Sequence, residues 1–195
     1  MKAKTKKSLI QYVLFGAIAL SLYVTGLHAE VVGFAQRGLM ATGIMKPDLD
    51  EYEFPINNSA KADLNFRLIN SKGEIVDMNH LKGKVIFMNM WATWCPPCIA
   101  EMPGISKLAK SMENENVEFI MISYDKNFNT AKKYKENKGF HFDVHSLEGQ
   151  LPNMFSSRGI PATYVIDARG ELAFTHIGMG EFDTDEFRDF LKTLM

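Results

Sequence analysis

The residues best suited to chemistry stand together in the run Trp94-Cys95-Pro96-Pro97-Cys98, which holds both cysteines of the 195-residue chain. A zinc site usually needs four Cys or His ligands, and a disulfide that closes so short a loop contributes little stability. The pair follows an apolar run and begins a predicted helix, whose N-terminus stabilises a thiolate through its partial positive charge and free N–H groups. The motif therefore predicts thiol–disulfide exchange. A structural bridge and half of a shared metal site are the alternatives.

The N-terminal sequence has the features of a membrane-targeting segment. Four lysines, at positions 2, 4, 6 and 7, precede the run 9–27, which is 19 residues long and has no formal charge. A helix of that length spans the hydrocarbon core of a bilayer, which is about 30 Å thick. The lysines would stay on the cytoplasmic side, so the rest would be exported. We predict a cytoplasmic basic N-terminus (1–7), a transmembrane signal anchor (8–28), a linker (29–60) and a folded domain (61–195).

A cleaved signal peptide is the alternative for this segment, and it would leave a secreted or periplasmic protein. Cleavage after Ala29 would put Leu27 where a small residue is preferred, and the apolar run exceeds the usual signal-peptide core, so we favour the anchor. Both interpretations place the cysteines outside the cytoplasm, where disulfides persist. The net charge is −1, and removing the four lysines leaves −5. This balance indicates neither a nucleic-acid partner nor affinity for anionic lipid.

Beyond residue 60, apolar periodicity alternates between strands and helices. Two near-continuous apolar runs are typical of strands buried on both faces. The predicted strands are 64–68, 74–77, 85–91, 117–124, 140–144, 163–166 and 171–177, and the predicted helices begin near 95 and cover 129–137, 151–156 and 183–194. This order predicts an α/β sandwich, in which a central mixed β-sheet is flanked by helices and an extra β-hairpin stands at the N-terminal side.

Four stretches of the domain resemble the thioredoxin superfamily, and within it the membrane-anchored TlpA/ResA-like thiol–disulfide oxidoreductases. They are 81–84 (LKGK), 91–98 (WATWCPPC), 101–103 (EMP) and 159–167 (GIPATYVID), in the family's order. The resemblance covers about residues 60–195 and implies a thioredoxin-like fold. It also implies that Pro161 is a cis-proline against the active-site disulfide, with Ile160 before it.

The resemblance assigns different roles to the two cysteines. The N-terminal cysteine of such a motif is the exposed one, so Cys95 is expected to attack a partner disulfide and form a mixed disulfide. Cys98, one helical turn deeper, then attacks Cys95 and releases the reduced partner. Because a buried thiol holds its proton, Cys98 needs a nearby base.

Glu101 is the predicted base. Positions 95, 98 and 101 step by three, so their side chains tend to share one helix surface. Thioredoxins carry a buried Asp in the preceding strand, where this chain has Asn89, which cannot act as a base. The TlpA/ResA branch often has a Glu that Glu101 matches. The alternative is a solvated Glu that the helix dipole favours in the first turn.

The remaining motif residues are expected to contact the substrate. Trp94 offers an apolar surface beside Cys95, and Ile160 and Pro161 form the opposing wall. Pro96 and Pro97 lie early in the helix, where a missing N–H costs little, and are expected to tune the redox potential. No metal site is predicted, because the spaced pair His141 and His145 falls in a predicted strand.

Together these observations predict an enzyme that reduces disulfides of exported proteins, in cytochrome c maturation or copper-site assembly by resemblance. Its redox group would be the Cys95–Cys98 disulfide, without a further cofactor. Expected partners are cysteine-containing exported proteins, a transmembrane electron donor and the membrane, but no nucleic acid. The protein would be a monomer, single-pass in the bacterial cytoplasmic membrane, with its catalytic domain facing the periplasm or cell exterior. A disulfide oxidase or isomerase and a Cu(I)-binding metallochaperone are the alternatives, since soft thiolates select Cu(I).

Overall fold

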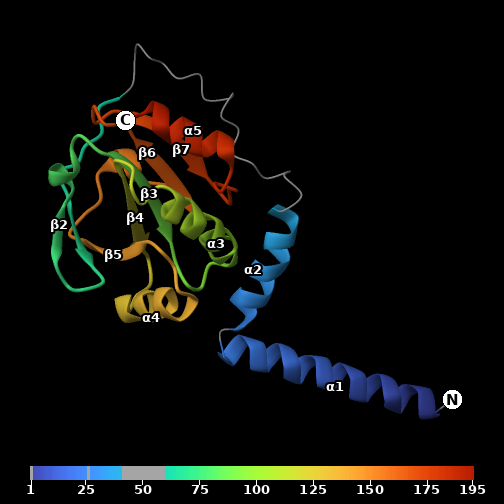
Figure 1. Cartoon of the computed structure of the whole chain (residues 1–195). Coiled ribbons are helices and arrows are strands. Elements are labelled where there is room, and N and C mark those ends of the chain that lie inside the picture. Colours follow the sequence, from blue (N-terminus) through green and yellow to red (C-terminus); the bar gives the residue numbers. More distant parts are fainter. Residues whose placement is uncertain (1, 26, 41–59) are drawn as a thin grey trace.

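A computed structural model describes residues 2–25, 27–40 and 60–195 of the chain. Two N-terminal helices, α1 (Lys2–Thr25) and α2 (Leu27–Met40), precede a domain built on one sheet (Figure 1). The strands of this sheet are β1 (Arg67–Asn70), β2 (Ile75–Asp77), β3 (Val85–Trp91), β4 (Val117–Ser123), β5 (Asp143–Glu148), β6 (Ala162–Ile166) and β7 (Leu172–Ile177).

The seven strands lie in the order β2-β1-β5-β4-β3-β6-β7. The neighbours β3, β4 and β5 are parallel, whereas β1, β2, β6 and β7 join the sheet antiparallel. Every residue of β3 is buried, as the unbroken apolar run predicts for a central strand. The sheet is therefore mixed, with β1 and β2 as the extra N-terminal hairpin, and this prediction is confirmed.

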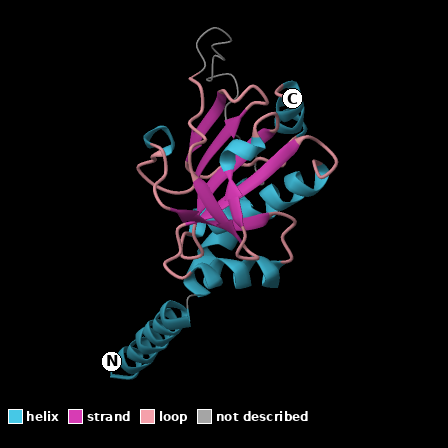
Figure 2. Cartoon of the chain, turned by 90° about the vertical axis from the view of Figure 1, so that its left-hand side faces the viewer, coloured by secondary structure: helices cyan, strands magenta, loops and turns pink. Residues whose placement is uncertain are grey.

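Both faces of the sheet are covered, one by α-helices and the other by short 3₁₀ helices and extended chain. The helices α3 (Pro96–Ser111), α4 (Phe128–Lys138) and α5 (Asp185–Thr193) contribute to one core. The crossovers from β3 to β4 and from β4 to β5 step in the same direction, so right-handed connections put α3 and α4 on the same face. The opposite core is closed by the short 3₁₀ helices η1 (Met78–Leu81) and η2 (Asn153–Phe155) and by the extended chain near residues 62–66 (Figure 2).

Two predicted strands are displaced along the chain. Strand β1 begins at Arg67, because Leu64 and Phe66 pack on the sheet face as extended chain outside the ladder. Strand β5 begins at Asp143 rather than at residue 140, because Phe140 and Phe142 pack on each other, with ring centroids 5.1 Å apart, before the strand pairing starts. Alternating apolar residues mark burial in both places rather than hydrogen-bonded pairing.

Residues 29–40 of the predicted linker (29–60) are helical, and residue 60 has no regular structure. Helix α2 packs on α3 through small residues: Ala29 is buried, and a Cβ at Gly33 would lie 3.1 Å from Ile99 Cγ2 and from the Pro96 carbonyl oxygen. Small residues at these two positions allow the two helices to approach closely. The rest of the predicted linker, 41–59, lies outside the described residues.

The predicted anchor (8–28) falls mainly on α1. Within residues 2–25, 27–40 and 60–195, no single helix is both long and apolar enough to cross a membrane. The pair Ile10–Thr25 and Ala29–Gly38, bent by 98°, meets that standard only when the two helices are taken together. The predicted boundaries of the anchor and of the folded domain stay predictions.

Candidate active site

The redox pair lies where β3 ends and α3 begins. Cys95 and Cys98 form a disulfide. Cys95 is the N-cap of α3, with extended backbone angles, and its Sγ accepts a hydrogen bond from the Cys98 backbone N–H at 3.3 Å. In the reduced enzyme this N–H and the helix N-terminus would stabilise the Cys95 thiolate.

The turn that presents Cys95 is fixed by hydrogen bonds before the cysteine and by two prolines after it. Thr93 donates to Asp125 through its backbone N–H at 3.1 Å and through its hydroxyl at 2.6 Å, which ties the turn to the end of β4. Pro96 and Pro97 occupy the first helical positions, where the absent N–H groups have no intrahelical partner to lose. Trp94 is 57% exposed, so its ring is available as a surface beside the disulfide.

Cys95 was predicted to be the exposed cysteine, but it is nearly buried. Cys95 is 4% exposed in the disulfide form, against 0% for Cys98. The reason is the loop before β6: Cys95 Sγ lies 3.7 Å from the carbonyl oxygen of Ile160, and the Ile160–Pro161 peptide bond is cis. The structure thus brings Ile160 and Pro161 to the disulfide, as the resemblance implies.

Glu101 is buried beneath the motif, 2% exposed, which excludes the alternative of a solvated side chain. Its Oε1 accepts from Asn89 Nδ2 at 2.8 Å, and its Oε2 accepts from the Gly180 backbone N–H at 3.2 Å. Burial raises the pKa of the Glu101 carboxyl to about 8, although both hydrogen bonds lower it; the nearby Glu181 carboxylate adds to the rise. A carboxyl with such a pKa can exchange a proton near neutral pH.

Asn89 is the polar neighbour that fits both protonation states of Glu101. Its Nδ2 also donates to Thr163 Oγ1 at 3.0 Å, while its buried Oδ1 has no partner in the described part of the chain. A protonated Glu101 carries an O–H donor, and a turned Asn89 amide would accept it through Oδ1. The position at which thioredoxins place their acid thus serves here to hold the carboxyl of the next helix.

Sequence reasoning missed two members of this cluster, Thr163 and Gly180. Thr163 stands opposite Asn89 in the pairing of β3 with β6, a register that no local pattern reveals. Gly180 brings its N–H to Glu101 from a turn in which a Cβ would lie 2.8 Å from Phe182 Cζ. The closely spaced glycines at 178 and 180 were the available signal, since they mark a turn after β7.

The pKa of Glu101 makes stability depend on pH. Folding raises the pKa of Glu101 from 4.5 to about 8, so the folded protein holds this proton more tightly than the unfolded chain. The resulting contribution to the free energy of unfolding is complete below pH 4.5 and is lost as the pH rises toward 8. Relative to Glu101→Gln, the oxidised wild type should lose about 4 kcal/mol of unfolding free energy over this range, at 1.36 kcal/mol per pKa unit. Denaturant unfolding of the full chain in detergent at both ends of the range measures this. Parallel pH profiles of the two proteins would contradict the assignment.

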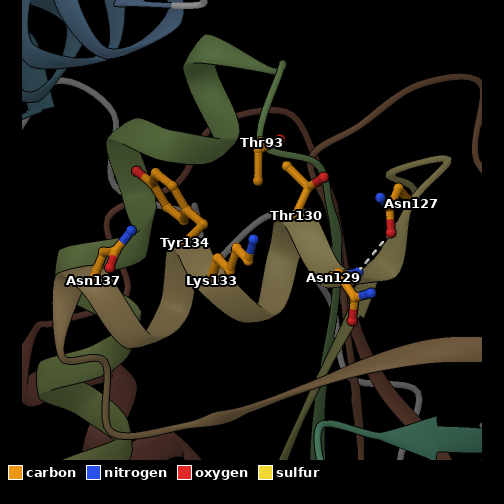
Figure 3. A pocket seen from close by; sticks show the side chains of 7 residues that line it. All are labelled: Thr93, Asn127, Asn129, Thr130, Lys133, Tyr134 and Asn137. Atoms are coloured by element: carbon orange, nitrogen blue, oxygen red, sulfur yellow. Dashed lines mark hydrogen bonds between the residues drawn. The ribbon is translucent and has the colours of Figure 1, made fainter.

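An open pocket of about 310 Å³ adjoins the redox turn. Figure 3 shows Thr93, Thr130 and Tyr134 around it, with Asn127, Asn129, Lys133 and Asn137 along α4 and the residue before it. The pocket shares Thr93 with the turn that carries Trp94, and its lining supplies amide, hydroxyl and ammonium groups. Such groups can pair with a peptide backbone, but none of them is redox-active.

A family model described as the AhpC/TSA family matches residues 58–175. This range includes both cysteines, Glu101 and its neighbours Asn89 and Thr163, but not Gly180 and Glu181. The chain belongs to the AhpC/TSA family. Within it the chain is similar to proteins named thiol-disulfide oxidoreductase ResA, and it is a thiol–disulfide oxidoreductase of the ResA/DsbE type.

Three curated relatives support this membership. The chain is 31% identical to ResA of Halalkalibacterium halodurans, over 66% of this chain and 74% of the relative. It is 27% identical to ResA of Bacillus subtilis, over 66% and 73%. It is 27% identical to the thiol:disulfide interchange protein DsbE of Vibrio cholerae, over 72% and 78%.

Solved structures agree on the fold of this oxidoreductase. A thiol:disulfide interchange protein of the thioredoxin family from Chlorobium tepidum matches with a TM-score of 0.58 and 25% identity, over 70% of this chain and 97% of that one. StoA from Bacillus subtilis matches with a TM-score of 0.54 and 19% identity, over 64% and 94%. The thioredoxin-like fold expected from the sequence is therefore confirmed.

Proposed function

We propose that this oxidoreductase reduces disulfides of exported proteins outside the cytoplasm, in cytochrome c maturation or copper-site assembly. The observation that carries the exchange chemistry is the buried Glu101, whose raised pKa fits it to exchange a proton with a thiol of the same helix. Removing that proton promotes closure of the Cys95–Cys98 disulfide, the step that completes reduction of a substrate.

The reaction transfers two electrons, and the Cys95–Cys98 dithiol is the redox group that supplies them. The Cys95 thiolate attacks one sulfur of the substrate disulfide, so a mixed disulfide forms and the first substrate thiolate leaves. Cys98 then gives its proton to Glu101 and attacks Cys95 Sγ. The second substrate thiolate leaves, and the Cys95–Cys98 bond closes. Glu101 returns its proton to one released thiolate and water protonates the other, so the substrate disulfide is reduced to two thiols while the enzyme dithiol is oxidised.

Around these sulfurs, Trp94, Pro96, Pro97, Ile160 and Pro161 would receive the substrate. Support comes from the exposure of the Trp94 ring and from the proximity of Ile160 to Cys95. The loop that covers Cys95 would move aside, or the substrate chain would pair with it, before attack. A cysteine pair in an extended segment fits this narrow approach.

The proposed location is the outer side of the bacterial cytoplasmic membrane, with α1 as a single-pass anchor. Its support is that apolar side chains are exposed all around α1, among them Val13, Phe15 and Ile18, each more than half exposed. A helix that is apolar all round needs an apolar surrounding. The oxidised enzyme would regain its electrons from a transmembrane donor and act as a monomer.

The reduction potential of the Cys95–Cys98 couple tests the direction of electron flow. The full chain, held in detergent, is equilibrated with redox buffers and the fraction of dithiol is measured. A reductant should have a potential near that of thioredoxin, about −270 mV, whereas an oxidant lies near −120 mV. A value at the oxidising end would overturn the proposal and favour the oxidase alternative.

A further inference from the structure

Helix α2 has two unlike faces. Its inner face contains the small residues Ala29 and Gly33, and Gly33 lies so close to α3 that a Cβ there would meet Ile99 and the Pro96 carbonyl oxygen at 3.1 Å. Its outer face, defined here as Leu27, Val31 and Phe34, follows the spacing i, i+4, i+7 of one helical stripe. These three side chains are 52%, 54% and 73% exposed. The helix therefore packs through its small residues and turns its large apolar ones outward.

Contacts with a second helix hold α2 in this orientation. Glu30 forms an ion pair with Lys138 at the end of α4, with Oε2 and Nζ 3.0 Å apart. Arg37 lies 5.7 Å from the centroid of the Phe34 ring, beside the outer face. Because α3 and α4 both contact α2, its rotation about its own axis is set by the domain. The outer face therefore points away from the domain.

The direction of α1 identifies what the outer face meets. The axes of α1 and α2 differ by 98°, and α1 leads away from the domain in both views (Figures 1 and 2). The charge-free run 9–27 ends at the first residue of α2. If α1 crosses the bilayer as proposed above, α2 starts at the membrane surface and runs along it. The domain then lies on one side of α2 and the lipid on the other.

We propose that the outer face of α2 docks into the interfacial layer of the bilayer and holds the oxidoreductase domain against the membrane. This inference rests on the proposed anchor. An amphipathic helix of this kind lies in the membrane plane with its apolar face about 5–10 Å deep in the headgroup region. The three residues of the outer face carry no charge, Glu30 is paired with Lys138, and Arg37 adds a single positive charge beside the face, so docking is expected to depend on apolar depth more than on anionic lipid.

Quenching by brominated lipid tests the position of the outer face. The full chain is reconstituted into phosphatidylcholine vesicles, with or without lipid brominated near the top of the acyl chains. Phe34→Trp places a reporter on the outer face, and Val31→Trp is a second reporter of the same face. Ile75→Trp is the matched control, because Ile75 is 58% exposed on β2 at the edge of the sheet. The native tryptophans are common to all variants, so the added emission is compared with that of the parent.

For a helix at interfacial depth we expect brominated lipid to remove about half of the emission that Phe34→Trp and Val31→Trp add, and almost none of that added by Ile75→Trp. Adding phosphatidylglycerol should leave the quenching unchanged. Equal quenching of all three variants, or none in the two reporters, would overturn the proposal. A blue-shifted but unquenched reporter would also overturn it, because a protein rather than lipid would then cover the face. Resistance of the parent to alkaline carbonate extraction tests the anchor separately: resistance without quenching refutes only the docking, and release refutes both.

Discussion

A Cys98→Ala variant should accumulate as a covalent complex with a disulfide substrate, whereas Cys95→Ala should form none. The reason is the asymmetry of the site: Cys95 caps α3 and receives the Cys98 N–H, while Cys98 is fully buried. Without Cys98 the mixed disulfide on Cys95 has no internal thiolate to resolve it. Turnover should fall by more than about a thousandfold in both variants, because the two thiols act as one unit.

Insulin serves as the disulfide substrate, and non-reducing electrophoresis with mass spectrometry identifies the complex. Wild-type enzyme under the same conditions should show reduced insulin and little complex. A complex formed through Cys98 in the Cys95→Ala variant would reverse the assigned order of attack. Complexes of equal yield in both variants would remove the distinction between attacking and resolving cysteine.

Glu101→Gln should slow closure of the Cys95–Cys98 disulfide by about a hundredfold, the lower range for loss of a positioned acid or base. In the wild type the closure rate should rise with pH through an inflection near 8, the pKa to which burial raises this carboxyl. The variant should lack that inflection. Stopped-flow kinetics of the mixed disulfide, followed by the emission change of Trp94, would measure both.

The fold should survive this substitution, because the Asn89 amide can turn its free Oδ1 toward the new NH₂ group while Gly180 still donates to the side-chain oxygen. Glu113→Gln, an exposed position just after α3, is the matched control and should behave as the wild type. An unchanged rate and inflection in Glu101→Gln would refute the role of Glu101 as base.

Much of the site was predictable because its determinants are local. The apolar run of β3 and the two prolines after Cys95 indicate a buried strand and a helix start without any distant information. The step of three residues from Cys98 to Glu101 likewise follows from helical geometry. The chemistry of the motif and the existence of these two elements were therefore accessible from the chain alone.

The parts that were not predictable depend on distant contacts. Thr163 and Gly180 reach Asn89 and Glu101 across 74 and 79 residues, through a strand register and a turn. Residues 27–40, most of which lie in the predicted linker, form helix α2 although glycine lowers helix propensity, and the missing side chain of Gly33 is what lets the helix pack. In each case tertiary packing overrode the local pattern.

The contact of α2 with α3 bears on how the catalytic domain can be studied in isolation. A fragment cut at residue 60, where the sheet-based domain starts, lacks Gly33 and uncovers Ile99, the neighbour of Cys98 in the first turn of α3. That turn supplies the N–H that binds Cys95 Sγ. Redox potentials and thiol reactivities from such a fragment would describe an enzyme with altered solvation at its catalytic helix. A fragment that begins at Leu27 keeps this surface as it is in the full chain.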